Sequence, residues 1–215
     1  EAQRKESLAW REPIIFGIIT PVYNVPLSFF IRTAQSVTQQ SYPHWRWYIA
    51  DASSNEDIRE YLTFLAAQDE RIVLIRLAEN GGISANSNAA LQRASEEAIC
   101  EYVVLLDHDD KLAPEALYAV AKLIREKPDA DFVYSDEDKI NEIDHRHSPT
   151  FKPDWSPEML LCANYLCHIS VMRRSLIERA GGFDPTKDGA QDWDLFLRVS
   201  ELTDKIHHIP KVLYH

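Results

Sequence analysis

The sequence has few cysteines and little positive charge, and each shortage excludes a class of protein. Its three cysteines, Cys100, Cys162 and Cys167, include no Cys-x-x-Cys pair. We therefore expect free or buried thiols in a reducing compartment, and neither a disulfide framework nor a zinc motif. Lys and Arg number 23 against 34 Asp and Glu, which gives a formal net charge of −11. Nonspecific nucleic-acid binding needs a basic face, so we expect no nucleic-acid partner.

A long apolar segment and a secretory leader are also lacking. No apolar run approaches the roughly 20 residues that a transmembrane helix needs, and the segment 1–6 is mostly charged. The sequence starts without Met and stops at His215, directly after a strand-like segment. We therefore expect a domain excised from a longer protein, with any peripheral membrane association made by regions outside this sequence.

Strand-like and helix-like segments alternate through the first half of the chain. This pattern with short connections predicts an α/β domain whose central sheet is mainly parallel and covered by helices on both faces. The expected strands are 14–20, 45–50, 72–77, 102–106 and 132–135, and the expected helices are 28–39, 57–67, 83–98 and 114–126. The second half is less regular, with a proline-rich excursion over 141–157. It is followed by a strand in 167–172, helices at 175–180 and 193–201, and short strands at 206–209 and 212–214.

An apolar run that stops at three carboxylates is the most informative feature. The strand-like segment ending at Leu106 is followed by Asp107, His108, Asp109 and Asp110. Crowded carboxylates repel one another unless a positive group sits among them, and oxygen ligands suit Mg²⁺ or Mn²⁺. A solvated acidic turn is the alternative. Two further Asp-x-Asp triplets occur, at 136–138 and 192–194.

Polar or small-residue turns follow four of the expected strands. These turns are 20–24, 51–54, 80–82 and 107–110. Because ligands of open α/β sheets bind beyond the carboxyl ends of the strands, the turns together favour a binding site at that edge. Each one alone is ordinary loop chemistry.

The order of these motifs resembles the family 2 glycosyltransferases of the GT-A fold. The resemblance extends from Pro13 to His215, and several segments are also similar to bacterial enzymes of O-antigen and surface-polysaccharide assembly. The matching motifs are Thr20-Pro-Val-Tyr-Asn24, Asp51, Asn80-Gly-Gly-Ile-Ser84 with Asn88, Asp107-His-Asp-Asp110, Tyr134-Ser-Asp-Glu-Asp-Lys139, Phe151-Lys-Pro-Asp-Trp155, Gly189-Ala-Gln-Asp-Trp-Asp-Leu195 and His208-Ile-Pro-Lys-Val-Leu-Tyr-His215.

This resemblance implies a Rossmann-like nucleotide-diphospho-sugar transferase. The expected reaction moves a sugar from a nucleoside diphosphate-sugar donor to a glycan or glycolipid acceptor, with inversion and with Mn²⁺ or Mg²⁺. The implied organisation is one domain, with a nucleotide-sugar-binding half at about 13–136 and an acceptor and catalytic-base half at about 137–215. Residues 1–12 form an N-terminal extension. The implied location is the cytoplasm or the inner face of the membrane.

The resemblance assigns the nucleoside pocket to Thr20, Tyr23 and Asp51. The Asp51 carboxylate would accept a hydrogen bond from a base N–H, and its alternative role is a helix cap or Asx-turn. The following residues Ala52 and Ser53 depart from the Asp-Asp-Gly-Ser pattern that is commoner in the family, which leaves the base preference open.

Asn80 and Asn88 are the remaining candidates for donor binding. Asn80 begins an Asn-Gly-Gly turn that allows close approach of the backbone, and an ordinary turn is equally consistent with it. Asn88 lies one helical turn beyond Ser84, so both share a face that borders the expected nucleotide site or packs against the fold.

The resemblance assigns the metal site to Asp107, Asp109 and His215. Asp107 would meet the ribose or the metal shell, Asp109 would bind the metal directly, and His215 would be a third ligand. Histidine suits Mn²⁺ better than Mg²⁺. Asp110 would cap the next helix or orient the ligands.

Asp192 matches the family's catalytic base, which takes the proton from the acceptor hydroxyl. Asp194 competes for that role, and its alternative is a charge near a helix N-terminus. Trp193 would stack on a sugar or belong to the core.

Asp136 and Asp138 would line the acceptor side of the cleft or pair with Lys139. The histidines 145, 147, 207 and 208 are interpreted as surface or structural residues.

Two other functions remain open from the sequence. One is a non-catalytic sugar-nucleotide-binding module of a larger assembly protein, against which Asp192 argues. The other is a sugar-1-phosphate nucleotidyltransferase. That enzyme normally has a glycine-rich, basic phosphate loop after its first strand, whereas the segment 20–24 has neither glycine nor charge.

Overall fold

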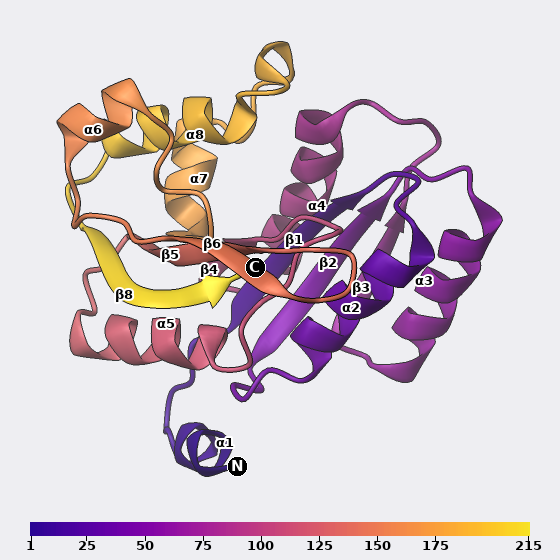
Figure 1. Cartoon of the computed structure of the whole chain (residues 1–215), viewed down its shortest axis with the longest axis horizontal. Coiled ribbons are helices and arrows are strands. Elements are labelled where there is room, and N and C mark those ends of the chain that lie inside the picture. The colour runs from indigo at the N-terminus through magenta and orange to yellow at the C-terminus, as the bar shows by residue number, and fades with distance from the viewer.

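The computed structural model describes residues 1–215, which form one eight-stranded mixed sheet between two layers of helices (Figure 1). The strands are β1 (Phe16–Val22), β2 (Trp45–Asp51), β3 (Ile72–Arg76), β4 (Tyr102–Leu105), β5 (Phe132–Ile140), β6 (Arg146–Thr150), β7 (Ser170–Arg173) and β8 (Ile206–Tyr214). The helices are α1 (Ala2–Leu8), α2 (Leu27–Thr38), α3 (Glu56–Gln68), α4 (Ile83–Glu97), α5 (Ala116–Glu126), α6 (Pro157–Cys162), α7 (Arg174–Ala180) and α8 (Gln191–Ser200), with a 3₁₀ turn at Pro185–Lys187.

The sheet has a parallel half and a mixed half. Its order is β3-β2-β1-β4-β7-β5-β6, and β8 pairs with β5. The strands β1 to β4 pair in parallel, whereas β7 runs antiparallel to both of its neighbours, β4 and β5. The carboxyl ends of β1, β2 and β4 therefore share one edge of the sheet with the amino end of β7. This arrangement confirms the predicted mainly parallel sheet.

Alternating side chains of the strands pack into two separate cores. In β1, Phe16 and Ile18 point to one face and Ile19 to the other, as the period of two in a strand requires. The first core is covered by α2, α3 and α5, and the second by α4, α6, α7 and α8 (Figure 1). The sheet runs without a break through both predicted halves of the domain, and the boundary between those halves stays a prediction.

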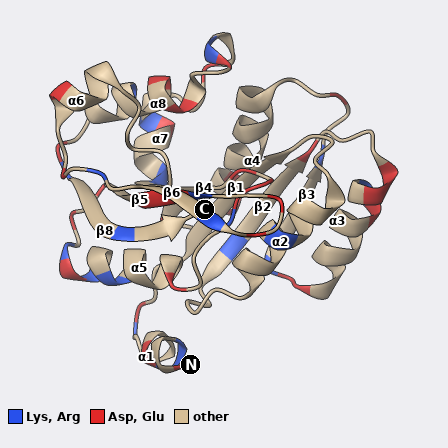
Figure 2. Ribbon diagram, viewed as in Figure 1, with Lys and Arg blue, Asp and Glu red and all other residues tan.

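Local signals explain where two of the helices begin. The Asn55 side chain accepts hydrogen bonds from the backbone N–H groups of Asp57 (2.9 Å) and Ile58 (3.5 Å) and so caps α3. Glu56 and Asp57 lie in the first turn of this helix, and the positive end of the helix dipole stabilises their negative charges (Figure 2). Gly82 precedes α4 with φ of 90°, a conformation that favours glycine.

The second half of the chain contains more regular structure than the sequence predicts. The strand expected at 132–135 continues to Ile140, and β6 lies inside the excursion expected to be irregular. The predicted pair of short strands around Pro210 is wrong, because β8 is one strand whose pairing with β5 shifts register near that proline. Helices α1 and α6 were not expected. No helix combines the length and apolar composition needed to cross a membrane.

Candidate active site

The predicted acidic motif lies at the carboxyl end of β4, next to Tyr214 and His168. The backbone N–H of Asp107 donates to the Tyr214 hydroxyl (3.2 Å), and the His168 ring stacks on Tyr214 with 4.7 Å between centroids. Carboxylate oxygens of Asp107 and Asp110 and a ring nitrogen of His168 lie within 4.8 Å of one another. Residues that are far apart in the sequence therefore meet around the strand end.

Burial and nearby charges both shift the pKa values in this group. Burial, followed by the nearby charge of Asp107, raises the pKa of Asp110 to about 6. Burial opposes protonation of His168, but the neighbouring Cys167, Asp107 and Asp192 raise its pKa to about 10. The imidazolium therefore offsets part of the negative charge at neutral pH.

Asp109 and His215 line a common pocket of about 910 Å³. Asp109 is exposed and forms neither a hydrogen bond nor an ion pair with its side chain. His215 is buried, and its Nδ1 contacts the Asp138 carboxylate at 2.6 Å. A carboxylate on one imidazole nitrogen leaves the other free to coordinate, as in many metal sites. Burial also lowers the pKa of His215, which favours the neutral form that ligates. Asp109 and His215 offer ligand types that a divalent cation accepts, but neither belongs to the groups of side chains whose ligand atoms lie within 4.8 Å of one another, and metal binding by them stays a prediction.

Asp192 lies in the first turn of α8 and faces the same strand end. It lines a small cavity together with Asp107, His168 and Phe183, and it accepts a hydrogen bond from the Gln191 side chain (3.0 Å). Burial raises the pKa of Asp192; His168 opposes this shift and Asp107 adds to it. The structure thus places one carboxylate of raised pKa beside the acidic motif.

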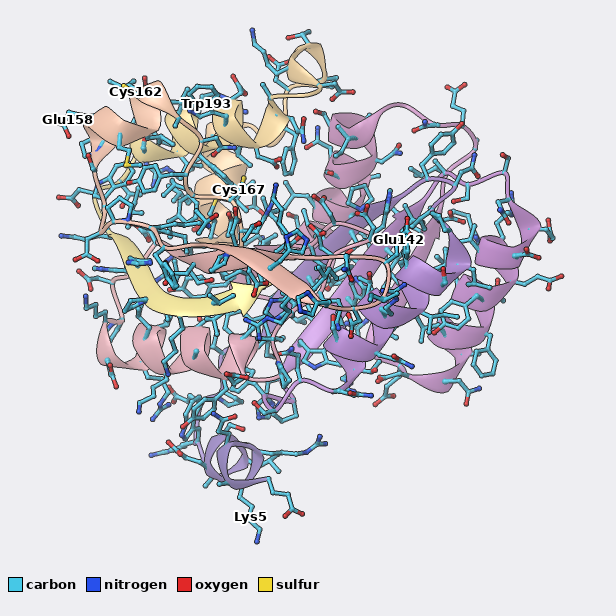
Figure 3. The ribbon with its side chains drawn as sticks, viewed as in Figure 1. Lys5, Glu142, Glu158, Cys162, Cys167 and Trp193 are labelled. Atoms are coloured by element: carbon cyan, nitrogen blue, oxygen red, sulfur yellow. The ribbon has the colours of Figure 1, made fainter.

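The neighbours of Asp192 have structural contacts of their own. Asp194 accepts two hydrogen bonds from Arg198 (2.9 and 2.6 Å), so its charge is paired along the helix. Trp193 donates from its indole to the Leu160 carbonyl (2.7 Å) and lies against α6 (Figure 3). Trp193 therefore packs as part of the protein interior, the alternative to stacking on a sugar. Asp194 has no contact with the acidic motif.

The candidate nucleoside residues lie at the ends of β1 and β2. Thr20 is buried and accepts a hydrogen bond from the Trp47 indole (2.9 Å). One oxygen of Asp51 accepts the Ser53 N–H (3.0 Å) in an Asx-turn, and the other pairs with Arg76. Tyr23 is 46% exposed. Asp51 therefore forms the Asx-turn that was the alternative to base binding. Nucleoside binding by Thr20, Tyr23 and Asp51 stays a prediction.

Asn80 and Asn88 both form contacts that organise α4. Asn80 accepts from the Gly82 N–H (3.1 Å) and the Asn86 side chain (2.9 Å). The Asn88 amide donates to the Phe183 carbonyl (2.8 Å) and accepts from the Phe183 N–H (2.9 Å). These contacts match the turn and packing alternatives, while donor binding by either residue stays a prediction.

The carboxylates of the second Asp-x-Asp triplet have partners other than Lys139. Asp136 contacts His208 (2.9 Å) and accepts the backbone N–H of Lys152 (2.8 Å). Asp138 pairs with Arg146 (2.7 Å) as well as with His215. The expected pairing with Lys139 is therefore wrong, because that side chain is exposed on the strand. The interpretation of His208 as structural agrees with its position between Asp136 and Asp154.

Sequence reasoning missed His168, Lys152 and Tyr214. His168 precedes β7, and the search for strand-end residues overlooked it because only the antiparallel direction of β7 brings its amino end to the site. The Lys152 side chain is 1% exposed and reaches Glu137 (3.2 Å) and the carbonyls of Cys167 and His168 (2.5 and 2.9 Å). In the sequence, only its position inside the motif Phe151-Lys-Pro-Asp-Trp155 pointed to Lys152.

Comparison with known proteins gives a consistent result. The family described as glycosyl transferase family 2 matches residues 17–181. The O-antigen biosynthesis protein RfbC of Myxococcus xanthus is 35% identical over 217 residues, which cover all of this chain. The chain spans only 16% of the length of that relative.

Two solved structures share the fold. TarS of S. aureus in complex with UDP-GlcNAc is 20% identical with a TM-score of 0.76, over 94% of this chain and 58% of that one. The mannosyltransferase PcManGT from Pyrobaculum calidifontis in complex with GDP-Man and Mn²⁺ is 18% identical with a TM-score of 0.65, over 97% of this chain and 63% of that one. At these identities the likeness shows the fold alone, and it confirms the expected GT-A architecture.

The raised pKa of Asp110 predicts a pH-dependent effect of Asp110→Asn on stability. The carboxyl has a pKa of about 6 when folded and 3.8 as the reference for the unfolded chain. Between these values the folded protein holds a proton that the unfolded chain has released, so the free energy of unfolding falls as pH rises. Asn cannot ionise, so the variant gains stability relative to the parent from about pH 4 to about pH 7. Urea unfolding measures this difference. A difference independent of pH, like that expected for Asp204→Asn at an 86% exposed side chain, contradicts the assignment.

Asn88→Ala separates the packing role from donor binding. Losing both hydrogen bonds to Phe183 is expected to lower the free energy of unfolding by about 1–3 kcal/mol. Gln92→Ala, on the exposed face of the same helix, is expected to change it by less than about 0.5 kcal/mol. Urea unfolding and nucleotide calorimetry together decide. Unchanged stability with weakened nucleotide binding in Asn88→Ala refutes the packing role.

Proposed function

The chain belongs to glycosyl transferase family 2 and is a glycosyltransferase domain, and from this we propose a specific reaction for it. It moves a sugar from a nucleoside diphosphate-sugar to an acceptor hydroxyl, with inversion and with a divalent cation, in the synthesis of a bacterial cell-surface polysaccharide. The observation that carries this proposal is the juxtaposition of Asp192 with the acidic motif after β4. One sheet edge thus holds a group for proton transfer and groups for a cation.

The comparisons support the substrate classes of this proposal. The relative RfbC is named for O-antigen biosynthesis, and the TarS and PcManGT structures contain a UDP-sugar and a GDP-sugar. Sugar donors of this chemistry carry a diphosphate, which needs positive charge in a protein of net charge −11. A cytoplasmic location, with contact to the inner face of the membrane, follows from such donors and from a lipid-linked or growing glycan acceptor.

Asp109 and His215, with Asp107 and Asp110 beside them, are the residues that would hold Mn²⁺ or Mg²⁺. Such an ion supplies Lewis-acid stabilisation of the departing diphosphate. Asp138 keeps the His215 ring in place, and the backbone N–H and carbonyl of His215 pair with those of Lys111 (2.9 and 2.8 Å). The carboxylates of the acidic motif thereby keep a fixed position relative to the pocket.

The donor nucleoside would lie over Thr20, Tyr23 and Asp51, next to the acidic motif along the same edge. His108 links the two regions, because its Nδ1 contacts the Pro21 carbonyl at 3.0 Å. Asn80 belongs to the turn before α4 on the same side. This placement directs the diphosphate toward Asp107.

Asp192 acts as the general base. The acceptor hydroxyl transfers its proton to the Asp192 carboxylate as its oxygen attacks the anomeric carbon, while the bond from that carbon to the diphosphate breaks and the diphosphate leaves with the electron pair. A raised pKa makes the carboxylate a better proton acceptor near neutral pH than an ordinary aspartate. Attack from the side opposite the diphosphate gives inversion.

Asp192→Asn is expected to lower kcat by about 10²–10⁴ while leaving donor binding intact, because the amide cannot accept the proton. Asp194→Asn is the matched control in the same helical turn. It loses an ion pair with Arg198 and is expected to keep kcat within about threefold. Transfer rates with a panel of sugar nucleotides test both variants. Equal kcat for the parent and Asp192→Asn removes Asp192 as the base.

Metal-dependent donor binding is expected to depend on Asp109. Calorimetry with UDP, GDP and TDP should detect binding that Mn²⁺ strengthens, and Asp109→Ala should abolish that strengthening. Asp204→Ala removes one negative charge at an exposed position far from the motif and serves as the control. If no nucleotide binds under any metal condition, the proposed donor class is wrong.

A further inference from the structure

A thiol, an imidazole and a carboxylate meet beside the acidic motif. The Cys167 sulfur, a ring nitrogen of His168 and a carboxylate oxygen of Asp192 lie within 4.8 Å of one another. We call these three residues the Cys167–His168–Asp192 cluster. Cys167 and His168 stand just before β7, whereas Asp192 comes from α8, so cysteine spacing in the sequence could not reveal the group.

We propose that the Cys167–His168–Asp192 cluster binds a thiophilic divalent cation such as Zn²⁺. Thiolate, imidazole and carboxylate are the ligand types of Zn²⁺, and three protein ligands leave one position open to solvent or to another molecule. Ligand atoms at about 2.0–2.3 Å from a tetrahedral ion lie about 3.3–3.8 Å apart. Side-chain movements of about an ångström therefore close the cluster around the ion.

The surroundings hold the first two ligands in place. The Lys152 ammonium donates to the carbonyls of both Cys167 (2.5 Å) and His168 (2.9 Å), and the Asn164 side chain donates to the Cys167 sulfur (3.2 Å). The Gln191 side chain donates to one oxygen of Asp192 and leaves the other available. Outer contacts of this kind orient metal ligands.

Ligand chemistry separates this site from the one after β4. The residues proposed for the site after β4 offer carboxylate oxygens and one imidazole but no thiolate, which suits Mn²⁺ or Mg²⁺, whereas a thiolate selects softer ions. Bound Zn²⁺ would replace a ring proton of His168 and occupy the Asp192 carboxylate. Zinc therefore inhibits sugar transfer by removing the base, a consequence that rests on the proposed function, whereas binding itself does not.

Cobalt absorption tests the binding directly. The reduced, chelator-treated protein is titrated with Co²⁺, whose thiolate complexes absorb in the near ultraviolet and whose tetrahedral complexes absorb in the visible. One equivalent is expected to give both bands, and Zn²⁺ is expected to remove them by displacement. Absence of the thiolate band in the parent overturns the proposal.

Two cysteine variants identify the sulfur ligand. Cys167→Ser is expected to lose the thiolate band, and Cys162→Ser is expected to keep it, because Cys162 lies on α6 at the outer surface, well apart from Cys167 (Figure 3). Asp192→Asn is expected to weaken Co²⁺ binding at least tenfold without removing the thiolate band. A thiolate band that persists in Cys167→Ser refutes Cys167 as the ligand. Co²⁺ affinity that is unchanged in Asp192→Asn refutes Asp192 as a ligand.

Inhibition forms the second arm of the test. At saturating Mn²⁺, micromolar Zn²⁺ is expected to inhibit the parent and Cys162→Ser alike. Cys167→Ser is expected to need at least about tenfold more Zn²⁺ for the same fractional loss, each variant being compared with its own zinc-free rate. Co²⁺ binding without sugar transfer refutes the proposed function and leaves the cation site standing. Transfer that Zn²⁺ inhibits equally in Cys167→Ser refutes the inhibitory role.

Discussion

Repulsion between carboxylates at one edge of the sheet is the constraint around which the second half of the chain is arranged. Acidic residues follow β4, end β5 and begin α8, and they converge from three elements. Burial raises the pKa of Asp110 and of Asp192, and the charge of Asp107 adds to both shifts. The excursion before α6 brings the Lys152 ammonium under the site, and the approach to β7 brings His168 into it. Both segments thus add positive charge next to the acidic motif, whereas Arg76, at the same edge of the parallel half, pairs with Asp51.

The partners of each carboxylate separate structural acids from candidate functional ones. Asp136, Asp138 and Asp194 each contact a histidine or an arginine from their own chain. No ion pair with Lys, Arg or His involves Asp107, Asp109, Asp110 or Asp192, although Asp107, Asp110 and Asp192 all lie close to His168. The His168 ring lies beside Asp107, Asp110 and Asp192 and offsets their charge only in part, so this edge is suited to a ligand that supplies more positive charge. Asp51 is a candidate functional residue that nevertheless has a partner of its own, because Arg76 pairs with it.

The sequence predicted the parallel half of the fold well because hydrophobic periodicity and local turn chemistry determine it. Strands β1 to β4 and helices α2 to α5 lie within two residues of their expected ends, and the motif order indicated the family. In the mixed half, β7, α7 and α8 lie within three residues of their expected ends, but the lengths of β5 and β8 and the presence of β6 were not predicted because non-local pairing decides them. Pro210 suggested two strands, yet pairing with β5 carries β8 past it with a register shift. His168 had no local signal and Lys152 only its place in a motif, since the antiparallel insertion of β7 and the burial of the ammonium bring them to the site.

His168 is the residue through which the two parts of the site affect each other. It belongs both to the group with Asp107 and Asp110 and to the group with Cys167 and Asp192. As an imidazolium it lowers the repulsion between the acidic motif and Asp192, and so permits a base carboxylate beside a cation site. As a neutral ligand it would give up that charge, and the added positive charge would then have to come from a bound ion. Under the proposed function, the protonation and ligation of this one ring would therefore couple the proposed cation site to the basicity of Asp192.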